Sequence, residues 1–260
     1  MQHFEESFLE AEDSQGVIAI YIFCDVCNFS LEDLSMTLKL MGKKRGMTQL
    51  FDDQGRVVPC TVIEIEPNVV TQLKSKERDG YVAVQLGFEK VVTSDPRTVV
   101  RRLGKPVVGH FKKSGLEPRR HLSETRLSET SAFSVGQEFG VDLFQSVAHV
   151  DVQGVTKGRG YQGVMKKFGF AGGPAAHGSG FHRHAGSTGM RSTPGRCFPG
   201  GKRASRLGFV RVTVQNLPVV KIDVEKRVIV VKGSIPGPRN GLVYVAPAVK
   251  KEPVLEKKKG

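Results

Sequence analysis

Residues 157–208 constrain this chain more than any other stretch, because their composition excludes a conventional folded core. They contain fourteen Gly, ten Lys or Arg, three His and no Asp or Glu. So few large apolar side chains cannot bury enough surface to offset the entropy lost on ordering the backbone. Positive charge without internal acids repels itself unless a polyanion neutralises it. The sequence therefore predicts a basic loop whose partner is a nucleic acid.

Both flanks of this loop carry alternating, Val-rich runs that are typical of β-strands. Turn residues such as those at 52–55 separate several of the runs, at a spacing of roughly ten residues. This pattern favours a sandwich or barrel over alternating strands and helices, and strands on both sides of the loop could close one barrel. The predicted strands lie at 42–51, 56–66, 69–75, 81–88, 138–144, 148–155, 209–217, 219–225, 227–233 and 241–248.

Residues 1–40 stand apart from the β-rich body. Residues 1–38 hold eight acids and no Lys or Arg, although the whole chain carries a net charge of +13. Three hypotheses stay open for this segment: an accessory extension, an over-long gene model whose true start is Met36, or half of a zinc site at Cys24 and Cys27. A zinc site needs a second ligand pair at matching spacing, and the other two cysteines are isolated.

Residues 93–131 are more polar, and the sequence predicts irregular structure with one short helix near 106–114. The bases of this region are either a solvated face or extra phosphate contacts, and both readings stay open. They include Arg101, Arg102, Lys105, Lys112, Lys113, Arg119 and Arg120.

Several features bear on where the protein works. The four cysteines have irregular spacing, which favours a reducing compartment over a disulfide framework. No apolar run approaches the roughly 18 residues needed to span a membrane. The apolar patch at 17–23 follows an acidic leader, unlike a signal or transit peptide. We therefore expect a cytoplasmic protein that does not bind membranes.

Candidate enzyme motifs in the loop lack essential partners. The glycines at 158, 160 and 163 match a dinucleotide-binding fingerprint, but no acid for the ribose follows at the required distance. His177, His182 and His184 have no carboxylate or close Cys to complete a metal site. Ser187 and Ser192 have histidines nearby but no carboxylate to orient one. We expect no catalytic residue, no metal, no cofactor and no small-molecule substrate.

The same loop suits RNA. Lys and Arg neutralise phosphates, and glycines let a backbone approach closely. Tyr161, Phe168, Phe170 and Phe181 offer faces on which unpaired bases can stack.

Several motifs in fixed order resemble the L3 family of large-subunit ribosomal proteins. They read GKKRGMTQLFDDQG, then DVQGVTKGRGYQGVMKKFGF at the loop entrance, HGSGFHRHAGSTGMRSTPGR at its centre, and VRVTVQNL followed by VIVVKGSIPGP. The resemblance covers about residues 41–248. Length and the absence of Trp fit the bacterial branch, and the wording of the central loop is similar to chlamydial members.

The resemblance implies a mainly β fold: a six-stranded translation-protein-type barrel with a long, basic, Gly-rich extended loop inserted between strands. The implied organisation is an acidic extension (1–40), the first part of the barrel with an irregular or helical insert (41–156), the extended loop (157–208), the second part of the barrel (209–248) and a basic tail (249–260).

The resemblance also implies a structural constituent of the large ribosomal subunit. Such a protein binds large-subunit rRNA near its 3′ end, acts early in subunit assembly, neighbours other large-subunit proteins and sends its loop toward the peptidyl transferase centre. The expected rRNA-binding residues are Lys157, Arg159, Tyr161, Lys166, Lys167, Phe168, His177, His182, Arg183, His184, Arg191, Arg196, Lys202, Arg203 and Arg206.

The expected loop tip is the run Ser187, Thr188, Gly189, Met190, Arg191, Ser192 and Thr193, with Arg191 closest to the centre. Some bacterial members carry a methylated glutamine where this chain has Ser192, so that modification is expected to be absent. Two alternatives remain: an RNA-binding regulator outside the ribosome, and a nucleotide-dependent oxidoreductase, against which the missing ribose acid argues.

Overall fold

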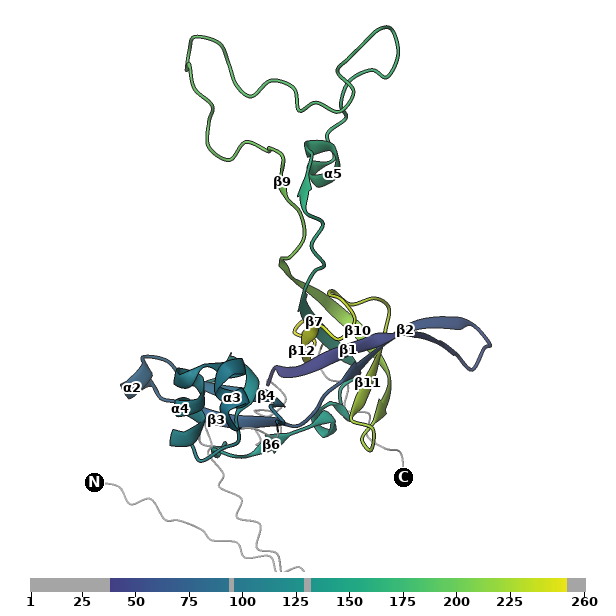
Figure 1. Cartoon of the computed structure of the whole chain (residues 1–260). Helices are drawn as coiled ribbons and strands as arrows, with labels where there is room; N and C mark the ends of the chain where they lie inside the picture. The colour runs from purple at the N-terminus through teal and green to yellow at the C-terminus, as the bar shows by residue number, and fades with distance from the viewer. Residues whose placement is uncertain (1–37, 94–95, 129–131, 252–260) are drawn as a thin grey trace, which may run out of the picture.

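The computed structural model describes residues 38–93, 96–128 and 132–251, and it is mainly β, as the sequence predicts (Figure 1). Six antiparallel strands pair in a closed order that begins at β1 and ends at β2. The order is closed because β2 pairs with β11, its neighbour in the order, and also with β1. We call these strands the six-stranded ring. In order around it they are β1 (Leu40–Phe51), β12 (Leu242–Pro247), β7 (His149–Val155), β10 (Arg211–Asp223), β11 (Val228–Lys232) and β2 (Val57–Glu64).

Strands β1 and β2 form a long hairpin, and its turn lies where the sequence predicts one. The Gly55 amide donates to the Asp52 carbonyl oxygen at 2.8 Å, and Gly55 has a φ of +72°, which glycine adopts without strain. The end of the hairpin extends beyond the ring in Figure 1, and its Met47, Phe51 and Val57 side chains are exposed.

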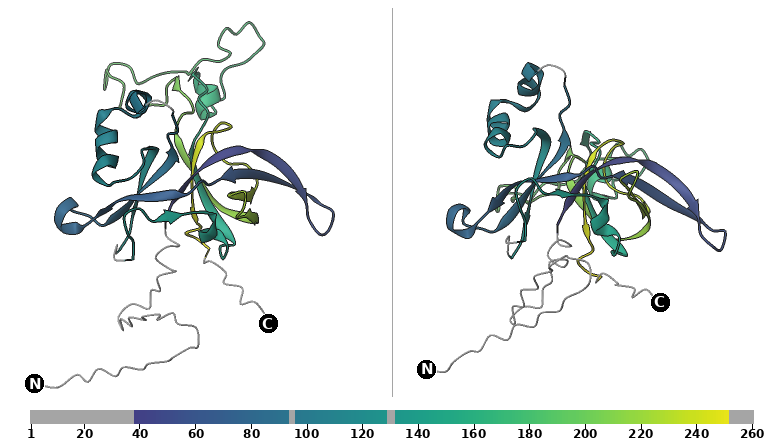
Figure 2. Two further views of the ribbon diagram at one scale, coloured as in Figure 1. Left: turned by 60° about the horizontal axis from the view of Figure 1, so that its bottom comes forward. Right: turned by 90° about the horizontal axis from the view of Figure 1, so that it is seen from below.

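A second sheet departs from the expectation that the strands before the loop all belong to one barrel. Its order is β5 (Arg119–Arg126), β4 (Ala83–Lys90), β3 (Asn68–Lys74) and β6 (Glu138–Phe139). Figure 2 shows this four-stranded sheet on one side of the ring, with the β1–β2 hairpin projecting on the other. One hydrophobic cluster nevertheless joins ring residues such as Ile63 and Ile229 to sheet residues such as Leu86 and Phe88. The ring and the sheet therefore share a core.

The described residues between 93 and 128 are more regular than predicted. The expected helix is present as α4 (Lys105–Lys113), but α3 (Pro96–Leu103) precedes it and β5 follows. Strand β5 is polar because it pairs on one side only, with β4, so much of its surface faces solvent. A further short helix, α2 (Lys76–Asp79), ends at Gly80, which adopts the left-handed conformation.

Two other strand predictions need correction. Only the first two residues of 138–144 form a strand, and Val141–Phe144 is the 3-10 helix η1. Its buried Val141 and Phe144 lie three residues apart, which matches the period of a 3-10 helix. The two strands predicted at 209–217 and 219–225 are one strand, β10, with a register shift between Val214 and Leu217. The predicted strand at 227–233 is present as β11, which pairs directly with β10 as an antiparallel hairpin.

The acidic segment with Cys24 and Cys27, and most of the predicted tail at 249–260, lie outside the described residues. No helix within the described ranges is long and apolar enough to cross a membrane.

Candidate nucleic-acid interface

The segment 157–208, which we call the basic arm, leaves the ring after β7 and returns to it at β10 (Figure 1). Backbone hydrogen bonds fasten its two legs near the ring. The Thr156 amide donates to the Val210 carbonyl oxygen at 2.9 Å, and the Arg159 amide donates to the Leu207 carbonyl oxygen at 2.9 Å. The foot of the arm therefore continues the pairing of the ring.

Close approach of the two legs depends on Gly208. Its φ is +79°, and a Cβ added there would collide with the Lys157 carbonyl oxygen of the opposite leg. Glycine alone tolerates both conditions. Just above this point the legs pair again as the two-residue strands β8 (Tyr161–Gln162) and β9 (Ser205–Arg206).

A single turn of helix, α5 (Val164–Phe168), ends the paired part of the arm. Val164 is buried, whereas Lys166 on the same turn is exposed. The Lys167 ammonium reaches across the arm and donates to the Ser205 hydroxyl at 2.5 Å and to the Arg206 carbonyl oxygen at 2.9 Å. Lys167 is therefore a brace between the legs as well as a cation.

Beyond α5 the arm has no regular secondary structure until β9, and only a few local contacts shape it. The Gly173 amide donates to the His182 carbonyl oxygen at 3.2 Å. The rings of Phe181 and His184 stack with their centroids 5.1 Å apart. The composition of this part of the arm cannot build a core. Its backbone therefore follows an open, extended course, with a few separate pairwise contacts between residues.

The predicted tip residues lie in this open part and are all exposed. The Ser187 hydroxyl donates to the Gly189 carbonyl oxygen at 2.8 Å, and the Met190 side chain is 74% exposed. Hydrogen bonds from Thr188 and Arg203 lower the pKa of the exposed Cys197 thiol. The tip is therefore near the returning leg through Cys197, a contact that sequence reasoning did not anticipate.

The predicted site residues occupy four parts of the arm. Lys157 and Arg159 lie at the foot, and Tyr161 and Arg206 face each other across the β8–β9 pair. Lys166, Lys167 and Phe168 lie on α5. The remaining positions belong to the open part: His177, His182, Arg183, His184, Arg191, Arg196, Lys202 and Arg203.

The electrostatics of the arm differ from those of the four-stranded sheet. Within the described ranges, none of the ten Lys and Arg of the arm forms an ion pair. In the sheet, by contrast, Lys74 lies 2.9 Å from a carboxylate oxygen of Glu124, and Lys90 lies 2.6 Å from one of Glu117. The cations of the arm thus remain available to an external polyanion.

Exposed aromatic rings accompany this charge. Tyr161 is 71% exposed and Phe181 is 46% exposed, as stacking on bases requires, whereas Phe168 and Phe170 are half-buried. Sequence reasoning missed Phe198 and Phe209, which are 59% and 81% exposed. The sequence around Phe198 resembles that around the predicted stacking residues, because it too is an aromatic residue among Gly, Pro and Arg. Phe209 was assigned to a strand, but β10 begins two residues later.

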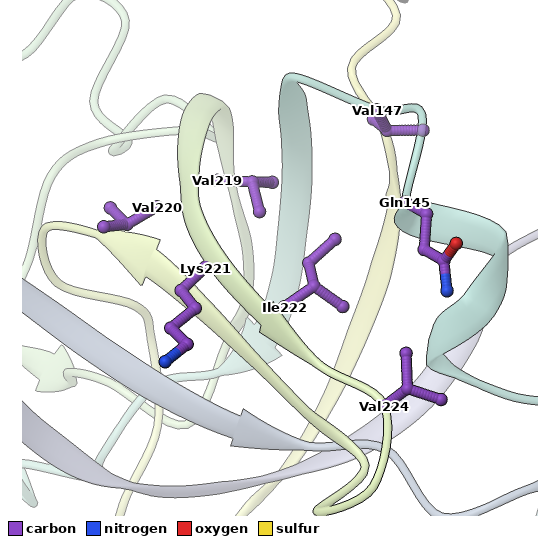
Figure 3. Close-up of a pocket in the computed structure, with 7 residues that line it drawn as sticks. All are labelled: Gln145, Val147, Val219, Val220, Lys221, Ile222 and Val224. Atoms are coloured by element: carbon purple, nitrogen blue, oxygen red, sulfur yellow. The ribbon is translucent and has the colours of Figure 1, made fainter.

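A hollow on the ring is lined mostly by aliphatic side chains. It has a volume of about 330 Å³ and lies between β10 and the segment that carries Gln145 and Val147 (Figure 3). Its lining is aliphatic apart from Gln145 and Lys221, so it offers no carboxylate or imidazole. Within the described ranges, no group of three or more His, Cys, Asp and Glu side chains is placed to hold a metal ion.

A β-rich body with an unpaired, basic and aromatic extension is typical of one class of protein, the nucleic-acid-binding proteins. Known proteins narrow this class. A model of the ribosomal protein L3 family matches residues 126–227. Large ribosomal subunit protein uL3 of Protochlamydia amoebophila is 61% identical over 224 residues, which cover 86% of this chain and 94% of that protein.

Other chlamydial proteins of the same name show similar agreement. The uL3 protein of Chlamydia felis is 57% identical over 210 residues, and that of Chlamydia trachomatis serovar D is 56% identical over 210 residues. Each match covers 80% of this chain and 95% of the relative. The chain belongs to the uL3 family of large ribosomal subunit proteins, as its motifs predicted.

Proposed function

We propose that this protein is a structural, non-enzymatic constituent of the large ribosomal subunit, located with the ribosome in the cytoplasm. It binds large-subunit rRNA near the 3′ end, contacts neighbouring large-subunit proteins and acts early in assembly. In this proposal the six-stranded ring is a translation-protein-type barrel, and the basic arm carries its loop tip toward the peptidyl transferase centre. The observation that carries the proposal is the arm itself, whose ten cations have no acidic partner within the described residues.

The arm's geometry supports a role for it as an RNA-filling extension. Its open part makes few internal contacts, so its path in the subunit depends on RNA packing around it. Charge neutralisation by Lys and Arg reduces repulsion between RNA segments, and the exposed rings suit stacking on unpaired bases. The protein then supports the geometry of the RNA, which performs the peptide-bond chemistry.

Cofractionation with the subunit tests this function. Cell extract is sedimented through a high-salt sucrose gradient, and the intact mass of the protein is determined in each fraction. Stoichiometric presence in the large subunit is expected. Recovery in the light fractions alone would contradict the ribosomal proposal and favour an RNA-binding regulator that acts outside the ribosome.

A deletion of residues 176–196 tests the arm. Because the removed segment contributes nothing to the hydrophobic cluster of the ring and sheet, the variant should keep its far-UV circular dichroism and its melting temperature. It should impair maturation of the large subunit. Normal subunits that contain the shortened protein would refute the assigned role of the arm.

A further inference from the structure

The helix pair α3–α4 carries a second concentration of positive charge, well separated in sequence from the arm. Residues 96–113 contain six Lys or Arg and no Asp or Glu. In Figure 1 the pair lies beside the four-stranded sheet, whereas the arm leaves the ring in another direction. The proposed function assigns the arm to RNA but leaves this second basic surface without a partner.

Five side chains of the pair have no partner among the described residues. They are exposed and take part in no hydrogen bond or ion pair within those ranges, unlike the neighbouring Arg119 and Arg120, which lie near Glu138 and Glu89. The five are Arg101, Arg102, Lys105, Lys112 and Lys113. Unpaired cations of one sign, concentrated on one element, are the electrostatic footprint of a polyanion site.

Helix α4 is anchored on the sheet, so its charges are presented from a fixed position. Phe111 of α4 is 1% exposed, and His110 Nε2 lies 2.9 Å from Gln85 Oε1 on β4. The Ser114 hydroxyl at the end of α4 donates to the Thr71 carbonyl oxygen of β3 at 3.1 Å. These contacts use the inner face of α4 and leave its outer face to solvent.

Gly109 lies in the middle of that outer face, between Lys105 and Lys112. A glycine in a helix interior is destabilising relative to alanine. Nothing in the described protein requires it, because an added Cβ would meet no atom within 4 Å and the φ of Gly109 is not positive. The missing side chain leaves room for a partner's backbone to approach α4 between two lysines.

We propose that the outer face of α3–α4 is a second RNA-binding surface, which contacts the phosphate backbone of a double-helical segment of large-subunit rRNA. This deepens the proposed function and rests on it. The choice of a duplex follows from what the face lacks: none of the large exposed apolar side chains within the described ranges lies in 96–113. Without a ring for stacking, the face suits backbone contacts, whereas the arm with its exposed rings suits unpaired bases.

The spacing along α4 is compatible with such contacts. Seven residues of α-helix rise about 10 Å, so Lys105 and Lys112 can bind different phosphates with Gly109 between them. The logarithm of the affinity falls linearly with the logarithm of the salt concentration. Each phosphate neutralised on a duplex adds about 0.9 to the magnitude of this slope. Three lysines account for a slope of up to about 2.7.

The test compares two triple variants of the full chain. Lys105→Gln, Lys112→Gln and Lys113→Gln together remove charge from the proposed face. The control removes equal charge from exposed positions on and beside the β10–β11 hairpin, through Lys221→Gln, Lys226→Gln and Lys232→Gln. Binding to a 20-base-pair RNA duplex and to a 20-nucleotide single strand is measured by fluorescence anisotropy between 50 and 300 mM salt, and binding to a large-subunit rRNA transcript is measured in parallel.

The face variant should lower the duplex slope by about 2 to 2.7, whereas the control should lower it by less than 1. At 150 mM salt the larger change corresponds to about a hundredfold weaker duplex binding. Single-strand binding should change less, because the arm carries it. Equal losses in the two triple variants would show a net-charge effect alone and overturn the proposal.

Gly109→Ala gives a second readout that loss of folding cannot imitate. Alanine should raise the melting temperature of the free protein by about 1–3 °C while weakening duplex binding severalfold. A stabilised variant that binds the duplex as tightly as the parent would contradict close approach at this point.

Two further outcomes separate this proposal from others. If the face variant keeps its duplex slope but fails to enter subunits, the face binds an acidic protein instead, and the RNA proposal is wrong. If the unaltered chain neither binds the rRNA transcript nor enters subunits, it is the proposed function that fails.

Discussion

Asn68, the first residue of β3, connects the ring to the four-stranded sheet through its side-chain amide, and its removal should destabilise the whole fold. Its Oδ1 accepts a hydrogen bond from the Met41 amide at 3.0 Å, and its Nδ2 donates to the carbonyl oxygens of Met41 and Glu66, both at 3.0 Å. Strand β2 pairs with β1 only from Lys43 onward. At Met41 the amide of Asn68 therefore takes the place of a neighbouring strand.

The magnitude follows from the groups that lose their partners. Asn68 and Met41 are fully buried, so Asn68→Ala leaves the Met41 amide and carbonyl without hydrogen bonds. Each unsatisfied buried group costs about 1–3 kcal/mol. Partial rescue by a water in the space left behind favours the lower half of that range, so we expect a loss of about 3 kcal/mol. For a protein of this size, that loss lowers the melting temperature by about 6–12 °C.

Thermal and urea unfolding, followed by far-UV circular dichroism, measure the effect. Gln49→Ala is the matched control, because Gln49 is exposed on the β1–β2 hairpin and makes no side-chain hydrogen bond among the described residues; it should change the free energy of unfolding by less than about 0.5 kcal/mol. A loss below about 1 kcal/mol for Asn68→Ala would refute the view that its amide stands in for a strand.

Three further predictions use single side chains. Gly208→Ala should open the foot of the arm and lower the stability of its pairing by at least roughly 1–2 kcal/mol. Gly158→Ala, which has an unhindered Cβ and no positive φ, should leave the foot paired. Amide hydrogen exchange of the two legs measures the difference between the variants. Burial lowers the pKa of His121 despite an opposing carboxylate, so the stability it contributes is complete above the unfolded pKa of about 6.5 and is lost as the pH falls below it. His121→Gln should flatten that dependence in urea unfolding at pH 5 and 7.5. The exposed Cys197, with its lowered pKa, should be alkylated by iodoacetamide well before the buried Cys60, whose pKa is raised by burial; peptide mass mapping gives the order, and equal rates would contradict the assigned environments.

The sequence predicted most reliably those features that depend on local chemistry. The β1–β2 turn has the Asp and Gly that such a turn needs, and the apolar, Val-rich runs of β11 and β12 mark strands of the ring. The absence of acids in the arm indicated its unpaired charge without any knowledge of its path. These features can be predicted from the sequence because the local residues determine them without a distant partner.

Features that depend on distant partners could not be predicted. The sequence predicted two strands at 209–217 and 219–225, but the register shift between Val214 and Leu217 lets β10 continue. The Asp151 carboxylate on β7 accepts a hydrogen bond there from the Asn216 backbone amide at 2.8 Å. Strand β5 has a polar sequence, and only its pairing with β4 makes it a strand. The link between the four-stranded sheet and the ring likewise depends on a distant partner, because Asn68 bonds to Met41, 27 residues away.

The two proposed RNA surfaces differ in how much order they possess before binding. The α3–α4 face is fixed through α4 to a sheet that shares its core with the ring, so binding there requires little ordering of the backbone. The open part of the arm has few internal contacts, and ordering it on RNA costs conformational entropy. Once the rigid face holds an RNA helix, the arm meets its own RNA at a high effective concentration. The two proposals together therefore imply that the rigid face governs the first encounter with RNA and that the arm governs the lifetime of the complex.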